Sequence, residues 1–220
     1  MTTFTVRHAT DADLDALVGL RRYAEQWLHA EGIDQWTDHA RGARTIQTGI
    51  ATGTSLVVQT AAGGVIASFS LAGPDLDFWT PGDDLDAALY LYKFMIGPQG
   101  RGTGLGDALL DWACSRATEH GKRWLRLDCW RTNTRLQAYY ARRGFTLVRT
   151  VTVPGRDSGA LLQRPATMRM SGSSITLLAD LPDDARTGRL GPGNDLAIDS
   201  GLRGSRLVDA SPRQDVRDQL

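Results

Sequence analysis

A strand, a glycine-rich loop and a helix follow one another between residues 92 and 112, and this junction restricts the fold more than any other feature. The mainly apolar run 92–96 indicates a buried strand, and residues 97–106 then contain five glycines. Beyond the loop, apolar residues recur at helical spacing: Leu105, Ala108, Leu109 and Trp112. Such a junction directs several unpaired backbone N–H groups toward one point, which predicts an anion site at the start of the helix.

Three phosphate-binding patterns can be compared with this loop. A Walker P-loop is excluded because no Lys follows the last glycine. A dinucleotide fingerprint is weakened because Asp107 occupies its third glycine position, although Asp128 lies at about the right distance to bind a ribose. The third pattern, Arg/Gln-x-x-Gly-x-Gly, is filled by Arg101, Gly104 and Gly106, but it is short. A tight strand–helix turn without any ligand is the structural alternative.

The sequence after the loop favours the third pattern. Residues 124–130 alternate as a half-buried strand, Asn133 opens a short helical stretch, and Gly144 is placed to end it. With Arg101-x-x-Gly104-x-Gly106, Asn133 and Tyr140-x-x-x-Gly144-Phe145 in this order and spacing, the chain resembles the GCN5-related N-acetyltransferases (GNAT) over roughly residues 3–165.

The resemblance and the local patterns agree on an α/β fold. They imply a GNAT-like mixed central sheet of about six to seven strands flanked by helices, in the order β-α-α-β-β-β-α-β-α-β-β. We expect residues 1–168 to form this domain and residues 169–220 to form a C-terminal extension, partly mobile, because no aromatic residue follows Phe145. Segments 174–181 and 207–208 retain enough apolar residues for short strands. Deletion of residues 171–220 is expected to leave the fold and coenzyme A binding largely intact.

The resemblance implies acetyl-CoA as the acetyl donor. Its pyrophosphate would lie on the backbone N–H groups of the loop, with the Thr103 hydroxyl as a further donor. The Arg101 guanidinium either contacts phosphate or lies on the loop surface, and Asn133 either bonds the cofactor or caps its helix. The residues assigned to the cofactor are the loop, two strand positions whose backbone would bond the pantetheine arm, and the helix start: Arg101, Gly102, Thr103, Gly104, Leu105, Gly106, Phe94, Ile96 and Asn133.

The catalytic residues implied by the resemblance are fewer. Tyr140 matches the family's general acid, a phenol that stays protonated at neutral pH, although an aromatic core residue would give the same pattern. Many family members place a Glu base early in the strand before the loop, and Tyr90 stands there. Asp128 is the substitute candidate, with a strand-end carboxylate bonded to backbone as its structural alternative, and Asp75 and Asp77 are weaker candidates.

The resulting hypothesis is an N-acetyltransferase that acts on a primary amine by direct attack on the thioester. The stretch 75–92 holds five aspartates and no Lys or Arg, which favours a cationic small-molecule acceptor, although a solvated loop has the same composition. A peptide amine is the second acceptor class, and a homodimer is an option. The alternative function is a non-catalytic acyl-CoA-binding or interaction module of the same fold.

Composition limits the other function classes. The 25 basic residues balance the 25 acidic ones, so nucleic acid is not an expected partner. No run of about 18 apolar residues predicts a membrane span, and no signal peptide is expected at the N-terminus. Cys114 and Cys129 fall in an expected helix and strand as buried free thiols, which favours a reducing, cytoplasmic compartment. No metal site is expected.

Overall fold

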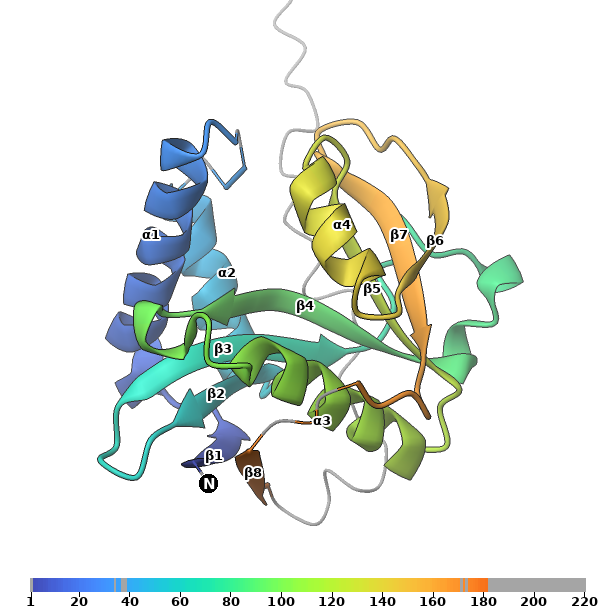
Figure 1. The fold of residues 1–220 in the computed structure, drawn as a ribbon. Helices are drawn as coiled ribbons and strands as arrows, with labels where there is room; N and C mark the ends of the chain where they lie inside the picture. The colour runs from blue at the N-terminus through green and yellow to red at the C-terminus, as the bar shows by residue number, and fades with distance from the viewer. Residues whose placement is uncertain (1, 34, 37–38, 171, 173, 182–220) are drawn as a thin grey trace, which may run out of the picture.

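A computed structural model describes residues 2–33, 35–36, 39–170, 172 and 174–181. In this part of the chain, eight strands form one sheet, and helices lie against both of its faces (Figure 1). The strands are β1 (Thr2–His8), β2 (Ser55–Gln59), β3 (Val65–Ala72), β4 (Ala88–Ile96), β5 (Trp124–Trp130), β6 (Thr146–Thr150), β7 (Ser158–Pro165) and β8 (Ile175–Asp180). The α-helices are α1 (Leu14–Ala30), α2 (His39–Ala51), α3 (Leu105–Glu119) and α4 (Thr134–Ala141).

The strand order is β6-β7-β5-β4-β3-β2-β1-β8. Only the pairs β4–β5 and β1–β8 are parallel, and the other neighbours are antiparallel. The predicted α/β class and the predicted order of elements through β7 are therefore confirmed, and β8 adds an eighth strand to the six or seven expected. Within the described residues, no helix combines the length and the apolar character needed to cross a bilayer.

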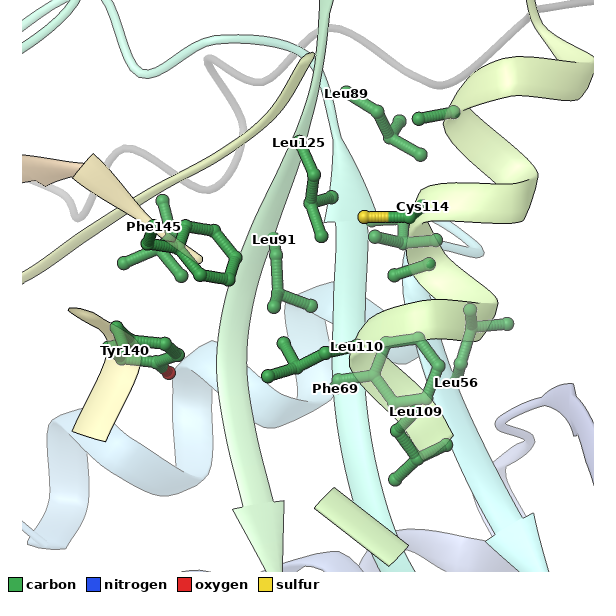
Figure 2. Close-up of a cluster of buried hydrophobic side chains, with 14 of the residues drawn as sticks. Leu56, Phe69, Leu89, Leu91, Leu109, Leu110, Cys114, Leu125, Tyr140 and Phe145 are labelled. Atoms are coloured by element: carbon green, nitrogen blue, oxygen red, sulfur yellow. The ribbon is translucent and has the colours of Figure 1, made fainter. Parts of the chain in front are cut away.

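Each face of the sheet has its own apolar core because side chains alternate along the strands. On β2, Leu56 and Val58 pack with α3, whereas Val57 points to the opposite face and packs with α1 and α2. Figure 2 shows the α3 face as a continuous cluster, which includes Phe69, Leu91, Leu109, Leu110, Cys114, Leu125, Tyr140 and Phe145. This packing fixes α3 and α4 against the strands from which they project.

The sheet face that packs with α1 and α2 is covered along its remaining part by the loop between β3 and β4. The loop between β3 and β4 buries Phe78 and Trp79 against Tyr90 and Leu161, with 1% and 0% of the two loop residues exposed. Trp79 and Tyr90 meet edge to face with ring centroids 5.6 Å apart. This loop is therefore a packed part of the core.

The strand β8 lies at the sheet edge next to β1. Six consecutive residue pairs align, from Thr2 with Ile175 to Arg7 with Asp180, and Leu177 packs against the main core. The segment 174–181 thus forms the strand that its composition allowed, and it does so beyond the predicted domain boundary at residue 168. Segment 207–208 lies outside the described residues, and the boundary itself stays a prediction that truncation can test.

Two truncations separate the contribution of β8 from that of the rest of the extension. Removal of residues 171–220 is expected to lower the Tm by about 4–8 °C, because loss of the half-buried Ile175 and Leu177 costs about 1 kcal/mol each. Removal of residues 182–220 should leave the Tm unchanged. Thermal unfolding measures both, and equal Tm values for the two truncations would show that β8 adds no stability.

Candidate active site

Strands β4 and β5 separate halfway along their length and open a large cleft. They pair in parallel only from Ala88–Trp124 to Tyr90–Arg126, although β4 continues to Ile96 and β5 to Trp130 (Figure 1). The cleft has a volume of about 1060 Å³ and is lined by β4, β5, the glycine loop, α4 and the α1–α2 region. Beyond Tyr90, the edge of β4 that faces β5 has no strand partner. Backbone groups along this edge therefore remain available to a ligand.

A bulge in β4 accompanies this separation. Ser68 of β3 aligns with Met95 and Ser70 aligns with Tyr92, so β4 has one residue more than β3 between the two pairs. Lys93 lies in this bulge with a φ of 51°, in the left-handed region that β-strand residues rarely adopt. The bulge lies in the part of β4 that no longer pairs with β5, and bulges bend the strand that carries them.

The glycine loop leads from β4 into α3 and leaves several of its N–H groups unused. Gly102 and Gly104 have φ values of 73° and 86°, which a side chain would strain. Among the described residues, no protein acceptor meets the N–H groups of Gly102, Gly104 and Gly106. With the N-terminus of α3 at Leu105, the loop has the geometry of an anion site.

Two polar side chains of the loop are already engaged. The Thr103 hydroxyl donates to the Gly100 carbonyl oxygen at 2.8 Å and accepts from the Leu105 N–H at 3.3 Å, so it shapes the loop. The Arg101 guanidinium stacks over the rings of Trp27 and Tyr23 at 4.2 and 5.3 Å from their centroids. This contact with α1 holds a cation at the mouth of the cleft, and the sequence motif did not indicate it.

Gly106→Ala tests the loop as a phosphate site. The added Cβ would lie 2.7 Å from the Tyr139 hydroxyl and 3.1 Å from Ile96 Cδ1, in a residue whose backbone is helical. We expect acetyl-CoA affinity to fall at least tenfold, about 1.4 kcal/mol, with little change in Tm. Calorimetric titration measures the affinity. Gly19→Ala in α1, where no atom lies within 4 Å, is the matched control, and equal affinities for both variants would contradict the expected phosphate position.

Asp128 lies on the separated part of β5 with its side chain in the cleft. Its Oδ1 is buried without a hydrogen-bond partner, which is costly for a carboxylate. Burial and the nearby charge of Asp75 raise the pKa of Asp128 to about 6, against the opposing effects of the Ser158 hydroxyl and the Arg156 guanidinium. A carboxylate with such a pKa is ionised at neutral pH and is basic enough to accept a proton.

Four of the five aspartates in the stretch 75–92 are ion-paired. Arg156 donates to Asp75 and to Asp77, each at 2.7 Å, and its guanidinium lies 4.6 Å from the Phe78 ring centroid. Further along the same loop, Asp83 pairs with Arg149 and Asp84 pairs with Arg123. Arginines distant in sequence thus compensate most of this acidic stretch, so it is not the open acidic patch that its local composition suggested.

The two tyrosines of α4 reach different parts of the cleft. Tyr140 is 6% exposed and meets Tyr139 and Phe145 edge to face, each with centroids 5.3 Å apart. Burial raises the pKa of the Tyr140 phenol, so this phenol stays protonated. Tyr139 stacks on Arg143, at 3.5 Å from its ring centroid, and points its hydroxyl at Gly106.

Asn133 caps α4 and connects it to the α1–α2 region. Its Oδ1 accepts from the Leu136 N–H at 2.9 Å, and its Nδ2 donates to Gln35 Oε1 at 2.9 Å. An ion pair between Arg135 and Glu31 also connects α4 to the end of α1. The capping interpretation of Asn133 is therefore correct, and a contact with the cofactor stays a prediction.

Three of the positions considered in the sequence lie on β4: Tyr90, Phe94 and Ile96. Phe94 and Ile96 pack partly buried against the main core, as expected of their side chains. Tyr90 faces away from the cleft: its hydroxyl donates to the Leu85 carbonyl oxygen at 3.3 Å and accepts from Arg126 at 3.2 Å. The strand position at which the resemblance implied a Glu base thus holds a tyrosine that does not line the cleft. Sequence reasoning also missed Lys93, whose only signal is a lysine within an apolar run.

The comparisons with known proteins agree with this architecture. The Acetyltransferase (GNAT) family model matches residues 21–145. The Bacillus subtilis (strain 168) protein named uncharacterized N-acetyltransferase YesJ is 26% identical over 162 residues, which are 66% of this chain and 89% of that protein.

Solved structures give the same result. A GNAT-family acetyltransferase from Listeria monocytogenes aligns with a TM-score of 0.59 at 26% identity, over 74% of this chain and 94% of that one. One from Streptococcus agalactiae aligns with a TM-score of 0.59 at 18% identity, over 74% and 95%. The chain therefore belongs to the GNAT acetyltransferase family and is an N-acetyltransferase with acetyl-CoA as its acetyl donor.

Proposed function

We propose that the protein transfers the acetyl group of acetyl-CoA to the primary amine of a small molecule, with Asp128 as general base and Tyr140 as general acid. The observation that carries this proposal is the carboxylate of Asp128. Its Oδ1 is buried and unpartnered, and its pKa is about 6, in the cleft that Tyr140 and the glycine loop also line. These are the properties of a base that works at neutral pH.

The cleft has a place for each part of acetyl-CoA. The pyrophosphate lies on the N–H groups of the loop between Arg101 and Gly106, where the dipole of α3 favours negative charge. Arg101 and Arg142 line the same cleft and add positive charge. The pantetheine arm follows β4 at Phe94 and Ile96, where β5 no longer pairs with it, so the thioester reaches the level of Asp128 and Tyr140.

The reaction then needs three proton transfers. Asp128 accepts one proton from the acceptor ammonium, and the neutral amine attacks the thioester carbonyl. As the C–S bond breaks, the Tyr140 phenol donates its proton to the departing thiolate, and the second proton that the nitrogen loses as the amide forms restores the phenol. Burial raises the pKa of this phenol. The same desolvation destabilises the departing thiolate and raises the pKa of its thiol, so the phenol can still donate its proton.

The closed rim of the cleft favours a small acceptor over a peptide. The Gln35–Asn133 hydrogen bond and the Glu31–Arg135 ion pair join the α1–α2 region to α4 across the cleft. Arg21 stacks on Trp36 beside this bridge, at 4.2 Å from the ring centroid. An extended peptide would have to break these contacts, whereas a small amine fits beneath them.

The test combines binding with acceptor choice. Calorimetric titration should show acetyl-CoA binding, and release of free thiol should then be measured against matched sets of small amines and peptides with free N-termini. We expect small amines to be acetylated faster than any peptide. Faster turnover of peptides would overturn the acceptor class, and light scattering on the same samples would show whether the chain forms a homodimer.

A further inference from the structure

Lys93 is a nucleophilic group inside the cleft that the proposed mechanism does not use. It is one of only two lysines in the chain and lies in the bulge of β4. The left-handed φ of 51° turns it out of the regular alternation of the strand, and it lines the cleft together with Phe94, Ile96 and Tyr140. Its amine is thus in the compartment where the thioester would lie.

The surroundings of Lys93 do not neutralise its charge. Its Nζ donates to the Thr45 carbonyl oxygen of α2 at 3.2 Å, and no carboxylate of the described residues forms an ion pair with it. Burial, and next the positive charge of Arg21 on α1, lower the pKa of Lys93 to about 8. A large share of this amine is therefore neutral, and hence nucleophilic, at mildly alkaline pH.

Charged groups face this amine from several elements. Arg21 of α1 is paired with Glu25 at 2.5 Å, Arg41 of α2 lines the same cleft, and Asp128 faces the cleft from β5. The hydrogen bond from Lys93 Nζ to the Thr45 carbonyl oxygen places the amine in the α1–α2 part of the cleft.

We propose that Lys93 is a self-acetylation site, at which bound acetyl-CoA acetylates the Nζ of the same chain. The neutral amine attacks the thioester carbonyl, the C–S bond breaks and an amide bond forms. One proton moves from nitrogen to sulfur, so the products are N-acetyl-Lys93 and coenzyme A as the free thiol. The inference rests on the proposed position of acetyl-CoA in this cleft, and it adds an acceptor that belongs to the enzyme itself. Acetylation would remove one of the positive charges of the α1–α2 part of the cleft, where Arg21 and Arg41 remain.

The chain contains its own control. Lys122 lies outside the cleft, and its Nζ donates to the Asp86 carbonyl oxygen at 2.9 Å in an exposed hydrogen bond. Chemical acetylation by free acetyl-CoA would modify an exposed lysine at least as fast as a buried one. Acetylation directed by the cleft would instead select Lys93.

The experiment incubates the full chain with acetyl-CoA and no acceptor, and maps acetylated peptides by mass spectrometry over time. We expect Lys93 to be acetylated at least tenfold faster than Lys122, at a rate that rises with pH through about 8, because deprotonation produces the reactive amine. Excess coenzyme A should block this labelling, and unfolding in guanidinium should abolish the selectivity. In intact-mass spectra, Lys93→Arg should lose one acetyl group, whereas Lys122→Arg should keep it.

Calorimetric titration of the same samples distinguishes failure of the self-acetylation proposal from failure of the proposed acetyl-CoA position. If acetyl-CoA binds and Lys93 stays unmodified, or if Lys122 reacts equally fast, self-acetylation is wrong and the proposed transferase function stands. If acetyl-CoA does not bind, the proposed position of the donor fails, and the inference fails with it.

Discussion

Replacement of Asp128 by asparagine is expected to lower kcat by about 10²–10⁴-fold, because the amide cannot accept the proton of the acceptor ammonium. In the parent enzyme, kcat/KM should rise with pH through about 6, as the carboxyl ionises into its active form. The Asn variant should lack this limb of the profile. Steady-state kinetics at pH values on both sides of about 6 measures both effects.

Asp128→Asn should lower activity without lowering the stability of the fold at neutral pH. The pKa of Asp128 is raised on folding from 3.8 to about 6, so the folded state favours the protonated form. The stability linked to this proton is present below the unfolded value and is lost as the pH rises through about 6. Asp128→Asn removes the buried charge, so its Tm at neutral pH should equal or exceed that of the parent, which excludes unfolding as the cause of lost activity.

Two neighbouring aspartates provide the controls. Asp77 bonds the same arginine but lies outside the cleft with half of its side chain exposed, so Asp77→Asn should leave kcat nearly unchanged. Asp75→Asn removes a charge that raises the pKa of Asp128, so the acid limb should move to lower pH. Parent-like turnover by Asp128→Asn would show that another group, or water, is the base.

The parts of the fold that follow from local sequence were predictable. The strand–loop–helix junction rests on glycines that adopt positive φ, as at Gly102 and Gly104, and on apolar spacing that places Leu105 and Leu109 in the core. Gly144, with a φ of 80°, ends α4 where expected. Such features depend on neighbours in sequence, so a single chain reveals them.

The electrostatics of the site was not predictable, because it depends on pairs that are distant in sequence. Asp75 and Asp128 are both acidic residues near strand ends, yet Arg156 compensates the first and leaves the second to titrate near 6. The Arg156–Asp75 pair joins residues 81 positions apart. The loop's aspartates therefore looked like an open acidic patch in the sequence, and the fold distributes arginines among them.

Backbone irregularity was a second obstacle. Alternation along a strand predicts which face each side chain takes, and the bulge at Lys93 breaks that alternation in the middle of β4. A lysine within an apolar run therefore gave no indication that it lies in the cleft. The C-terminal segment also depends on a partner that is distant in sequence. Ile175 and Leu177 lie in a strand that pairs with the open edge of β1.

Tyr140→Phe is the second substitution with a large expected effect. It removes only the phenolic oxygen and keeps the ring that packs between Tyr139 and Phe145, so the fold and acetyl-CoA affinity should be retained. We expect kcat to fall about 10²-fold, near the lower end for general acid catalysis, because a thiolate is a fair leaving group. Stopped-flow release of free thiol, with calorimetry for affinity, separates the rate from binding.

Tyr139→Phe is the matched comparison, because the two adjacent phenols differ in what they contact. The Tyr139 hydroxyl lies against Gly106 at the start of α3, next to the proposed pyrophosphate position, so its loss should weaken acetyl-CoA binding more than it lowers kcat. The reverse pattern, with kcat lost only in Tyr139→Phe, would assign the acid to Tyr139. Unchanged kcat in both variants would show that neither phenol of α4 is the acid and that the proton comes from water or from another buried acid of the cleft, such as Tyr92.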